Sequence, residues 1–229
     1  MIITKFILVA VVGYLLGSIP FGLIISKRMS KVDVRQYGSG KLGTTNVLRT
    51  AGGKAAVLVF VLDLLKGMLA VLFAGLIFGR GYLVIGGFHW GVLMAQVIAA
   101  LAAIAGHNRS VFLGFRGGGR GVATFFGGLA ALFPPVALIG GEVFLIGAGL
   151  TKFVSLASIA AAVSTYAVLI PLTILHRFPV EYLVYALIGT IVIFIMHRDN
   201  ISRLLSGRER KLGEKVRLRR NSLPHTSKL

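Results

Sequence analysis

A glycine-rich basic segment, residues 37–54, carries the residue types best suited to binding an anion. It contains five glycines, four serines or threonines, one asparagine and three cations, but no acid. Glycine lets backbone N–H groups approach an anion closely, and Lys41, Arg49 and Lys54 add fixed positive charge. Such a segment suits a small phosphorylated ligand. Because long apolar runs flank it on both sides, we expect that ligand to bind at a membrane surface.

Two further polar segments could bring anion-binding groups to the same place. Residues 106–121 hold His107 and a glycine-rich stretch that leads to Arg120, just before an apolar run. Glycines ahead of a helix expose N–H groups, the helix dipole adds partial positive charge, and Arg120 can donate two parallel hydrogen bonds to a phosphate. His197 and Asn200 follow the last apolar run, three positions apart, so a helix would point both into one site. A flexible basic linker and an interfacial helix are the simpler interpretations of these two segments.

One ionisable pair lies inside an apolar run. Asp63 and Lys66 are three positions apart, so on a helix they share a face and can pair. Placing such a residue in a membrane helix costs about 2.5–3.5 kcal/mol. Two interpretations stay open: a structural ion pair, or a Lys66 that faces a polar pocket with Asp63 orienting it.

Several other kinds of site are excluded. Gly38, Gly40 and Gly43 match the spacing of a dinucleotide-binding loop, but no strand precedes them and the acid about 20 positions on, Asp63, lies within an apolar run. A Walker loop would need lysine where Thr44 stands. The chain has no cysteine, which excludes thiolate catalysis, cysteine zinc sites and disulfides. No histidine and acid spacing typical of zinc is present, so we expect neither a metal nor an organic cofactor.

The elements that must position these residues are membrane helices. Of the 229 residues 56% are hydrophobic, and the mean hydropathy is +0.86. Apolar runs near or above 18 residues predict helical spans, because a spanning backbone must satisfy its own hydrogen bonds. We expect an all-α integral membrane protein with seven transmembrane helices, the fourth and fifth being short and open to a partial or re-entrant interpretation. The expected spans cover residues 2–25, 55–78, 82–105, 122–133, 136–150, 154–175 and 180–196.

The first run carries Pro20 near its end, and a proline there frees a carbonyl group and bends the helix. No small-residue cleavage site comes early in this run, so we interpret it as a retained span rather than a signal peptide. Residues 1–205 form one membrane domain in this interpretation. Residues 206–229 form a basic cytoplasmic tail, solvated or lying on lipid.

Charge predicts the orientation. The net charge is +18, from 25 Lys and Arg against 7 Asp and Glu. In the seven-span arrangement every one of these cations falls on a single side, except Lys5, Lys66, Arg80 and Arg177. The positive-inside rule then places the N-terminus outside, and the C-terminus and both glycine-rich loops in the cytoplasm. The positive charge therefore indicates topology and contact with anionic lipid, and we expect no nucleic-acid partner.

Several short stretches follow one another in a recognisable order: Gly17-Ser-Ile-Pro-Phe-Gly22, Tyr37-Gly-Ser-Gly-x-x-Gly-x-Thr-Asn-Val-Leu-Arg49, Asp63-x-x-Lys66-Gly67, Gly106-His107, Gly119-Arg-Gly-Val-Ala-Thr124, Val154-Ser-Leu-Ala-Ser158 and His197-Arg-x-Asn200. Taken together and in order, these stretches resemble the acyl-phosphate-dependent glycerol-3-phosphate acyltransferase family of bacterial inner membranes. Two positions depart from the family pattern: Lys41 stands where asparagine is usual, and Arg120 stands where lysine is usual, after an extra glycine.

The resemblance implies a multi-pass enzyme of the bacterial inner membrane with its active site facing the cytoplasm. It would move a fatty acyl group from acyl-phosphate to the 1-hydroxyl of glycerol 3-phosphate. The products would be lysophosphatidate and phosphate, and the reaction would begin phospholipid synthesis. Glycerol 3-phosphate, acyl-phosphate and membrane lipids would be its partners, and a monomer could carry out the reaction.

The resemblance also implies roles for individual residues. His197, Asn200 and Lys66 would act in catalysis. We expect direct attack by the glycerol hydroxyl, whose proton would go to His197 or, as we favour, to a phosphate oxygen of the substrate. The residues expected to bind substrate are Ser39, Lys41, Thr45, Asn46, Arg49, His107, Arg120 and Ser155.

Two other functions compete with this hypothesis. A transporter of a phosphorylated solute would also need basic pockets and broken helices, but we find no internal repeat of the transporter kind. A lipid-binding scaffold would need only the basic tail, and would leave residues 37–54 without a role.

Overall fold

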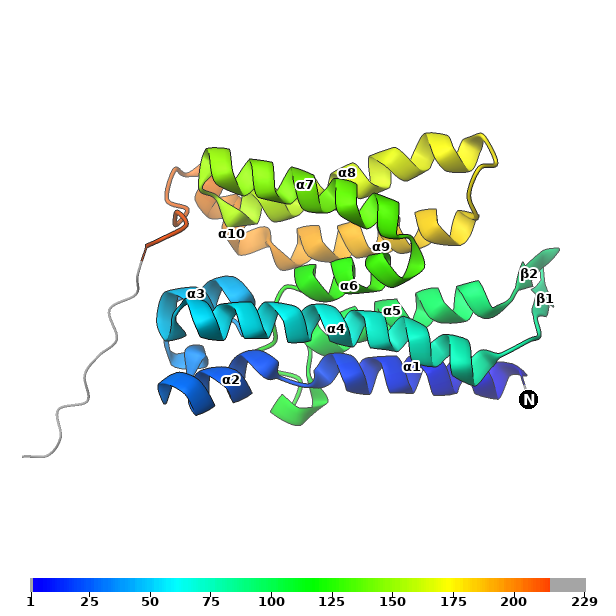
Figure 1. Ribbon diagram of the computed structural model, residues 1–229, viewed down its shortest axis with the longest axis horizontal. Helices are drawn as coiled ribbons and strands as arrows, with labels where there is room; N and C mark the ends of the chain where they lie inside the picture. The colour runs from blue at the N-terminus through cyan, green and yellow to red at the C-terminus, as the bar shows by residue number, and fades with distance from the viewer. Residues whose placement is uncertain (1, 215–229) are drawn as a thin grey trace, which may run out of the picture.

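The computed structural model describes residues 2–214, and most of them are helical (Figure 1). Short 3₁₀ helices η1 (Val34–Gln36) and η2 (Val111–Leu113) and strands β1 (Leu83–Ile85) and β2 (Phe88–Trp90) lie in the connections. The helices are α1 (Ile2–Ser18), α2 (Phe21–Ser30), α3 (Thr44–Ala51), α4 (Gly53–Phe78), α5 (Val92–Asn108), α6 (Val122–Leu132), α7 (Pro134–Thr151), α8 (Val154–Ile174), α9 (Val180–Met196) and α10 (Arg198–Leu205).

Each of the seven expected apolar runs forms a helix, but not all are long enough to cross a membrane. Within residues 2–214 five candidate spans qualify by length and hydropathy: Ile2–Ser30, Gly53–Phe78, Val92–Leu113, Pro134–Thr151 and Val154–Ile174. A sixth qualifies if α9 and α10, which meet at a bend of 61°, count as one. Helix α6 has 11 residues and is short, as expected.

Two expected boundaries are wrong. The third apolar helix begins at Val92 rather than at residue 82, because β1 and β2 form an antiparallel hairpin ahead of it. Gly86 and Gly87, both with positive φ, form the hairpin turn. The fifth helix is not short: Pro134 and Pro135 lie in the first turn of α7, where proline is tolerated, and extend it to 18 residues.

Helix α6 lies at the centre of the molecule, between α1, α4 and α5 on one side and α7, α8 and α9 on the other (Figure 1). Phe125 of α6 stacks on Tyr185 of α9 with ring centroids 5.3 Å apart, and the Tyr185 hydroxyl donates to the Phe125 carbonyl. On its other side α6 approaches α4 so closely that a Cβ on Gly127 would lie 1.9 Å from the Leu64 carbonyl oxygen. This central packing fixes the two halves of the bundle relative to each other.

The polar connections gather at one end of the bundle. The N-terminus and the β1–β2 hairpin lie at one end of Figure 1, and α3, the α7–α8 turn and α10 lie at the other. The first basic loop, the α7–α8 turn with Lys152 and the tail after α9 are therefore at the same end, as the charge pattern predicted. The loop between α5 and α6 also leaves its helices toward that end.

Candidate active site

A cavity of about 600 Å³ lies where these segments meet. Helices α3, α4, α6, α7, α8 and the α9–α10 bend all contribute to its wall. Two of the predicted site residues, Ser39 and Lys66, do not line it. Those that do are Lys41, Thr45, Asn46, Arg49, His107, Arg120, Ser155, His197 and Asn200.

The cavity also has an extended apolar wall. Val57 and Phe60 of α4 face it from one side, and Phe144 and Leu145 of α7 from the other. Val122, at the start of α6, also lines the cavity. A single cavity thus joins hydrogen-bond donors and cations to a surface that suits a hydrocarbon chain.

Asn46 organises the first glycine-rich loop. Its side-chain amide donates to the carbonyl oxygens of Val34, Tyr37 and Lys41 at 2.9–3.2 Å, and its oxygen accepts from the backbone N–H of Ser39 at 3.1 Å. The side chain is 3% exposed. Because these bonds all lie within the loop, Asn46 and Ser39 fix the conformation that presents Lys41 to the cavity.

Two arginines give the cavity an excess of positive charge. Among the described residues, neither Arg49 nor Arg120 has a carboxylate within ion-pair distance, and the Nε atom of each is buried without a hydrogen-bond partner. Burial lowers the pKa of both guanidinium groups, and the neighbouring Arg210 and Arg203 add repulsion. An anion bound between them would relieve this repulsion.

His107 is held by the second glycine-rich loop. The backbone N–H of Gly119 donates to the His107 carbonyl at 3.1 Å, and a Cβ at Gly119 would lie 2.0 Å from the imidazole Nε2. Only glycine fits there. His107 Nδ1 lies 3.5 Å from the Asp63 carboxylate, and both side chains line the cavity.

Lys66 lies in a separate, small pocket. Its Nζ is 2.8 Å from Asp63 Oδ1 and donates to the Ile19 carbonyl at 3.3 Å. That carbonyl lies at the break between α1 and α2, immediately before Pro20. The break is where we expected the proline to bend the first apolar run. The pocket measures about 10 Å³, so the expectation that Lys66 contacts substrate finds no support in this geometry. Asp63 lines both pockets and connects Lys66 to the main one.

The bend between α9 and α10 brings His197 and Asn200 into the cavity wall together, as predicted. His197 Nδ1 lies 2.8 Å from the Ile193 carbonyl. A carbonyl only accepts, so Nδ1 carries the proton of the neutral ring and Nε2 is left as an acceptor. The Oδ1 atom of Asn200 is buried without a hydrogen-bond partner among the described residues.

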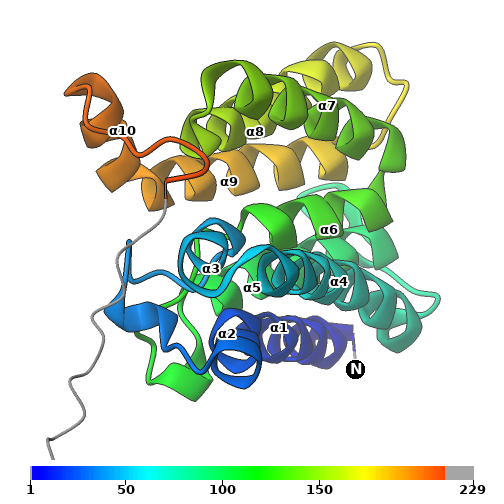
Figure 2. The ribbon, with the colours of Figure 1, turned by 60° about the vertical axis from the view of Figure 1, so that its left-hand side comes forward.

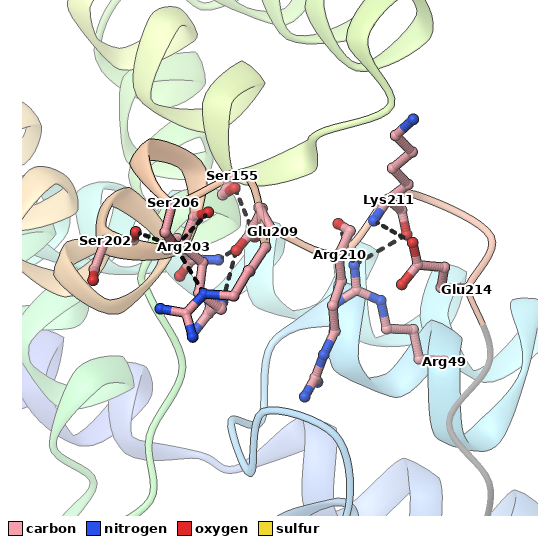
Figure 3. Close-up of polar contacts among 11 residues, drawn as sticks. Arg49, Ser155, Ser202, Arg203, Ser206, Glu209, Arg210, Lys211 and Glu214 are labelled. Atoms are coloured by element: carbon pink, nitrogen blue, oxygen red, sulfur yellow. Dashed lines mark hydrogen bonds and ion pairs between the residues drawn. The ribbon is translucent and has the colours of Figure 1, made fainter.

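Sequence reasoning missed Glu209. Its carboxylate accepts from Ser155 at 2.9 Å and from Arg203 at 2.8 Å (Figure 3). It also accepts from Asn200 at 2.6 Å. It also lines the cavity. The one signal in the sequence was an acid in an otherwise basic stretch, at residues 203–211.

The tail predicted to be solvated or to lie on lipid therefore begins with a segment that is hydrogen-bonded to the rest of the protein. The segment after α10 turns back toward α3 (Figure 2), and the backbone N–H of Leu212 donates to the Lys152 carbonyl at 2.7 Å. Residues 215–229 of the expected tail lie outside the described part of the chain.

Comparison with known proteins identifies the family. The family model described as glycerol-3-phosphate acyltransferase matches residues 7–207. The chain belongs to the glycerol-3-phosphate acyltransferase family. It is 60% identical over 217 residues to glycerol-3-phosphate acyltransferase 3 of Dehalococcoides mccartyi strain 195, covering 95% of this chain and 100% of that one. It is 41% identical to the glycerol-3-phosphate acyltransferase of Rippkaea orientalis, covering 91% and 94% of the two chains.

Solved structures of this family share the fold. The crystal structure of PlsY (YgiH), an integral membrane glycerol 3-phosphate acyltransferase, in its glycerol 3-phosphate form has a TM-score of 0.78 and 40% identity, covering 91% of this chain and 96% of that one. Its lysophosphatidic acid form has a TM-score of 0.76 and 39% identity, with the same coverage. This chain is accordingly a mostly helical integral membrane acyltransferase.

Proposed function

We propose that this acyltransferase moves a fatty acyl group from acyl-phosphate to the 1-hydroxyl of sn-glycerol 3-phosphate. Lysophosphatidate and phosphate are the products, and the reaction begins phospholipid synthesis. The observation that carries the proposal is the single cavity in which Arg49 and Arg120, neither paired with a carboxylate among the described residues, adjoin an apolar wall. Related solved structures in glycerol 3-phosphate and lysophosphatidic acid forms support the choice of acceptor and product.

The proposed donor is acyl-phosphate. Both substrates then carry phosphate, so the site must stabilise two anions close together, which cations in a partly buried setting do well. Arg120 and Arg49 face the cavity for this purpose, and Lys41 and Thr45 lie on the loop and helix beside them. The acyl chain would lie between α4 and α7, along Phe60 and Phe144.

The chemistry requires little from the protein. The 1-hydroxyl oxygen attacks the acyl carbonyl carbon, the bond from that carbon to the phosphate oxygen breaks, and phosphate leaves with the bonding electrons. The hydroxyl proton goes to a phosphate oxygen, whose pKa near 6 makes it an adequate acceptor. Before attack, His197 Nε2 accepts a hydrogen bond from the 1-hydroxyl and orients it, and the proton turns from Nε2 to the phosphate oxygen as the new C–O bond forms. Asn200 and Ser155 position the substrate. Lys66 acts through Asp63, which lines the same cavity.

The topology follows the charge pattern. We place the protein in the bacterial inner membrane with the N-terminus outside and the cavity end in the cytoplasm, because the basic loops lie at that end. We propose that the seven apolar helices lie between the two sides, with α6, of 11 residues, crossing only part of the way. We propose that a monomer carries out the reaction, since all the residues assigned to the site can come from one chain.

Phosphate release from palmitoyl-phosphate tests the proposal. Purified full-length protein should release phosphate rapidly only when glycerol 3-phosphate is present, and lysophosphatidate should appear in equal amount. Palmitoyl-CoA in place of palmitoyl-phosphate should give no product. Phosphate release that does not depend on glycerol 3-phosphate would refute the acceptor assignment. Product formation from palmitoyl-CoA but not from palmitoyl-phosphate would refute the donor assignment.

A further inference from the structure

A short segment after α10, residues 207–214, crosses between the two halves of the bundle at the cavity. We call it the strap. It is attached to the α7–α8 turn through the Leu212 N–H and the Lys152 carbonyl, 2.7 Å apart. On the other side, Arg49 of α3 donates to the carbonyls of Arg210 and Lys211 at 3.1 and 3.3 Å (Figure 3). The strap therefore contacts elements that are far apart in the sequence.

The strap uses groups that the proposed reaction needs for phosphate. Glu209 accepts hydrogen bonds from Ser155 and Asn200, and its carboxylate pairs with Arg203. Its side chain is 5% exposed, so the carboxylate is nearly enclosed by these donors. The hydroxyl, amide and guanidinium donors that hold a carboxylate in this way are also the donors that hold a phosphate oxygen.

The Glu209 carboxylate and a bound phosphate cannot accept hydrogen bonds from these donors at the same time. Each N–H or O–H donor makes one strong hydrogen bond, and two anions at hydrogen-bonding distance from the same donors repel each other. Arg49 is engaged only in part, because its Nη2 donates to the Arg210 and Lys211 carbonyls while its Nε has no hydrogen-bond partner among the described residues. A phosphate that binds Ser155 and Asn200 must first displace Glu209.

We propose that Glu209 is an internal competitor for the phosphate-binding groups of the cavity and thereby sets its apparent affinity for a phosphate monoester. The inference rests on the proposed function, because it takes Ser155, Asn200 and Arg49 as phosphate ligands. With the strap closed, Ser155 and Asn200 hold the Glu209 carboxylate, and Arg49 holds the carbonyls of Arg210 and Lys211. With the strap displaced these donors hold phosphate, and the apparent dissociation constant is the intrinsic one divided by the open fraction.

Phosphate binding to a Glu209→Gln variant tests the proposal. Calorimetric titration of detergent-solubilised full-length protein with inorganic phosphate should show a dissociation constant roughly tenfold lower than that of the unaltered chain, since a neutral amide holds the donors less strongly than a carboxylate. Glu214→Gln is the matched control. Glu214 also lies on the strap and its charge also acts on Arg49, but among the described residues its carboxylate accepts a hydrogen bond only from the Lys211 N–H and does not line the cavity. Its loss should therefore change phosphate binding far less than the loss of Glu209.

A disulfide gives a second test that does not remove Glu209. The chain has no cysteine, so the double variant Lys152→Cys and Leu212→Cys would hold the only thiols. Oxidation should lock the strap and weaken phosphate binding at least tenfold, and a reductant should restore it. Equal phosphate affinity in the oxidised and reduced forms would overturn the proposal, as would unchanged or weaker binding in a folded Glu209→Gln variant.

The Michaelis constants identify which phosphate competes. A lower constant for glycerol 3-phosphate in Glu209→Gln would assign the competition to the acceptor, and a lower constant for palmitoyl-phosphate would assign it to the donor. Failure of the proposed function is distinguishable, because it would abolish turnover of palmitoyl-phosphate in the unaltered chain. If turnover is present and Glu209→Gln changes neither constant nor phosphate affinity, the competition alone is refuted.

Discussion

The Nδ1 atom of His197 lies 2.8 Å from the carbonyl oxygen of Ile193, one helical turn earlier in α9. This contact fixes the tautomer of the neutral imidazole and leaves Nε2 as the acceptor on a side chain that lines the cavity. The geometry suits a residue that orients the attacking hydroxyl.

Replacing His197 by alanine separates orientation from general base catalysis. If the proton goes to the substrate phosphate, we expect kcat to fall by no more than about tenfold, because a general base would contribute about 10²–10⁴-fold. Steady-state rates from pH 5 to 9 provide the measurement. A larger loss, together with the disappearance of a pH dependence that the unaltered enzyme shows, would assign the proton to His197.

The Asp63–Lys66 pair should matter first for stability. The two side chains are 2% and 3% exposed, so Lys66→Met leaves a buried carboxylate without its cation and should cost about 3–5 kcal/mol. The double variant Asp63→Asn with Lys66→Met should recover part of this loss, since no unpaired charge is left. Apparent thermal midpoints in detergent compare the variants. A double variant less stable than Lys66→Met would contradict a pairing role.

Glycine between α4 and α6 permits the central packing. Gly127→Ala would place a Cβ 1.9 Å from the Leu64 carbonyl oxygen, so the helices must separate at a cost of about 1–3 kcal/mol. Gly149→Ala is a matched control within a helix, because nothing lies within 4 Å of its added Cβ. We expect a lower thermal midpoint only for Gly127→Ala. Equal midpoints would show that α4 and α6 do not pack this tightly.

The apolar wall should determine which acyl chains are accepted. Gly141 of α7 lines the cavity and has open space around an added Cβ, so Gly141→Leu can begin without a clash and would occupy space beside Phe144. We expect kcat/KM for palmitoyl-phosphate to fall about tenfold or more, with a smaller change for an eight-carbon donor and none in the Michaelis constant for glycerol 3-phosphate. An equal loss with both donors would place the chain elsewhere.

Asp33 in the first basic loop should make part of the protein's stability depend on pH. Hydrogen bonds from Arg35, and to a smaller extent from Lys27, hold the pKa of Asp33 well below its usual range despite partial burial. A carboxylate whose pKa is lower in the folded than in the unfolded chain stabilises the fold at pH values above its unfolded pKa of about 4. This stabilisation is lost as the pH falls from there toward the pKa of the folded state. Asp33 also accepts from the Arg35 N–H at the start of η1.

Asp33→Asn should therefore be less stable than the unaltered chain by about 1 kcal/mol at pH 6. The difference should shrink as the pH is lowered toward 3. Apparent thermal midpoints of the two proteins between pH 6 and pH 3 provide the comparison. A difference that stays constant over this range would show that Asp33 acts through its shape and not through its charge.

The sequence predicted the helices well because hydropathy is a local property. The apolar run that became α4 begins within two residues of its expected start and ends at Phe78 as expected. Charge alone predicted that the basic loops share one end. The failures lie where local signals mislead: the residues before α5 are apolar but form a hairpin, and Pro134 begins a helix instead of only ending one.

The sequence predicted which residues form the candidate site better than it predicted what each of them does. Motif order pointed to His107, Arg120 and His197, and all three line one cavity. It could not show that Lys66 turns to the Ile19 carbonyl, since that contact depends on how the α1–α2 break packs against α4. Nor could it find Glu209, whose partner Ser155 lies 54 positions away in the sequence.

A structure of the full chain with glycerol 3-phosphate bound would test the central claim most directly. The account predicts that its phosphate lies in the cavity of about 600 Å³, within hydrogen-bonding distance of the Arg120 guanidinium, with the 1-hydroxyl directed toward His197. A phosphate bound outside this cavity, or a 1-hydroxyl directed away from His197, would contradict it.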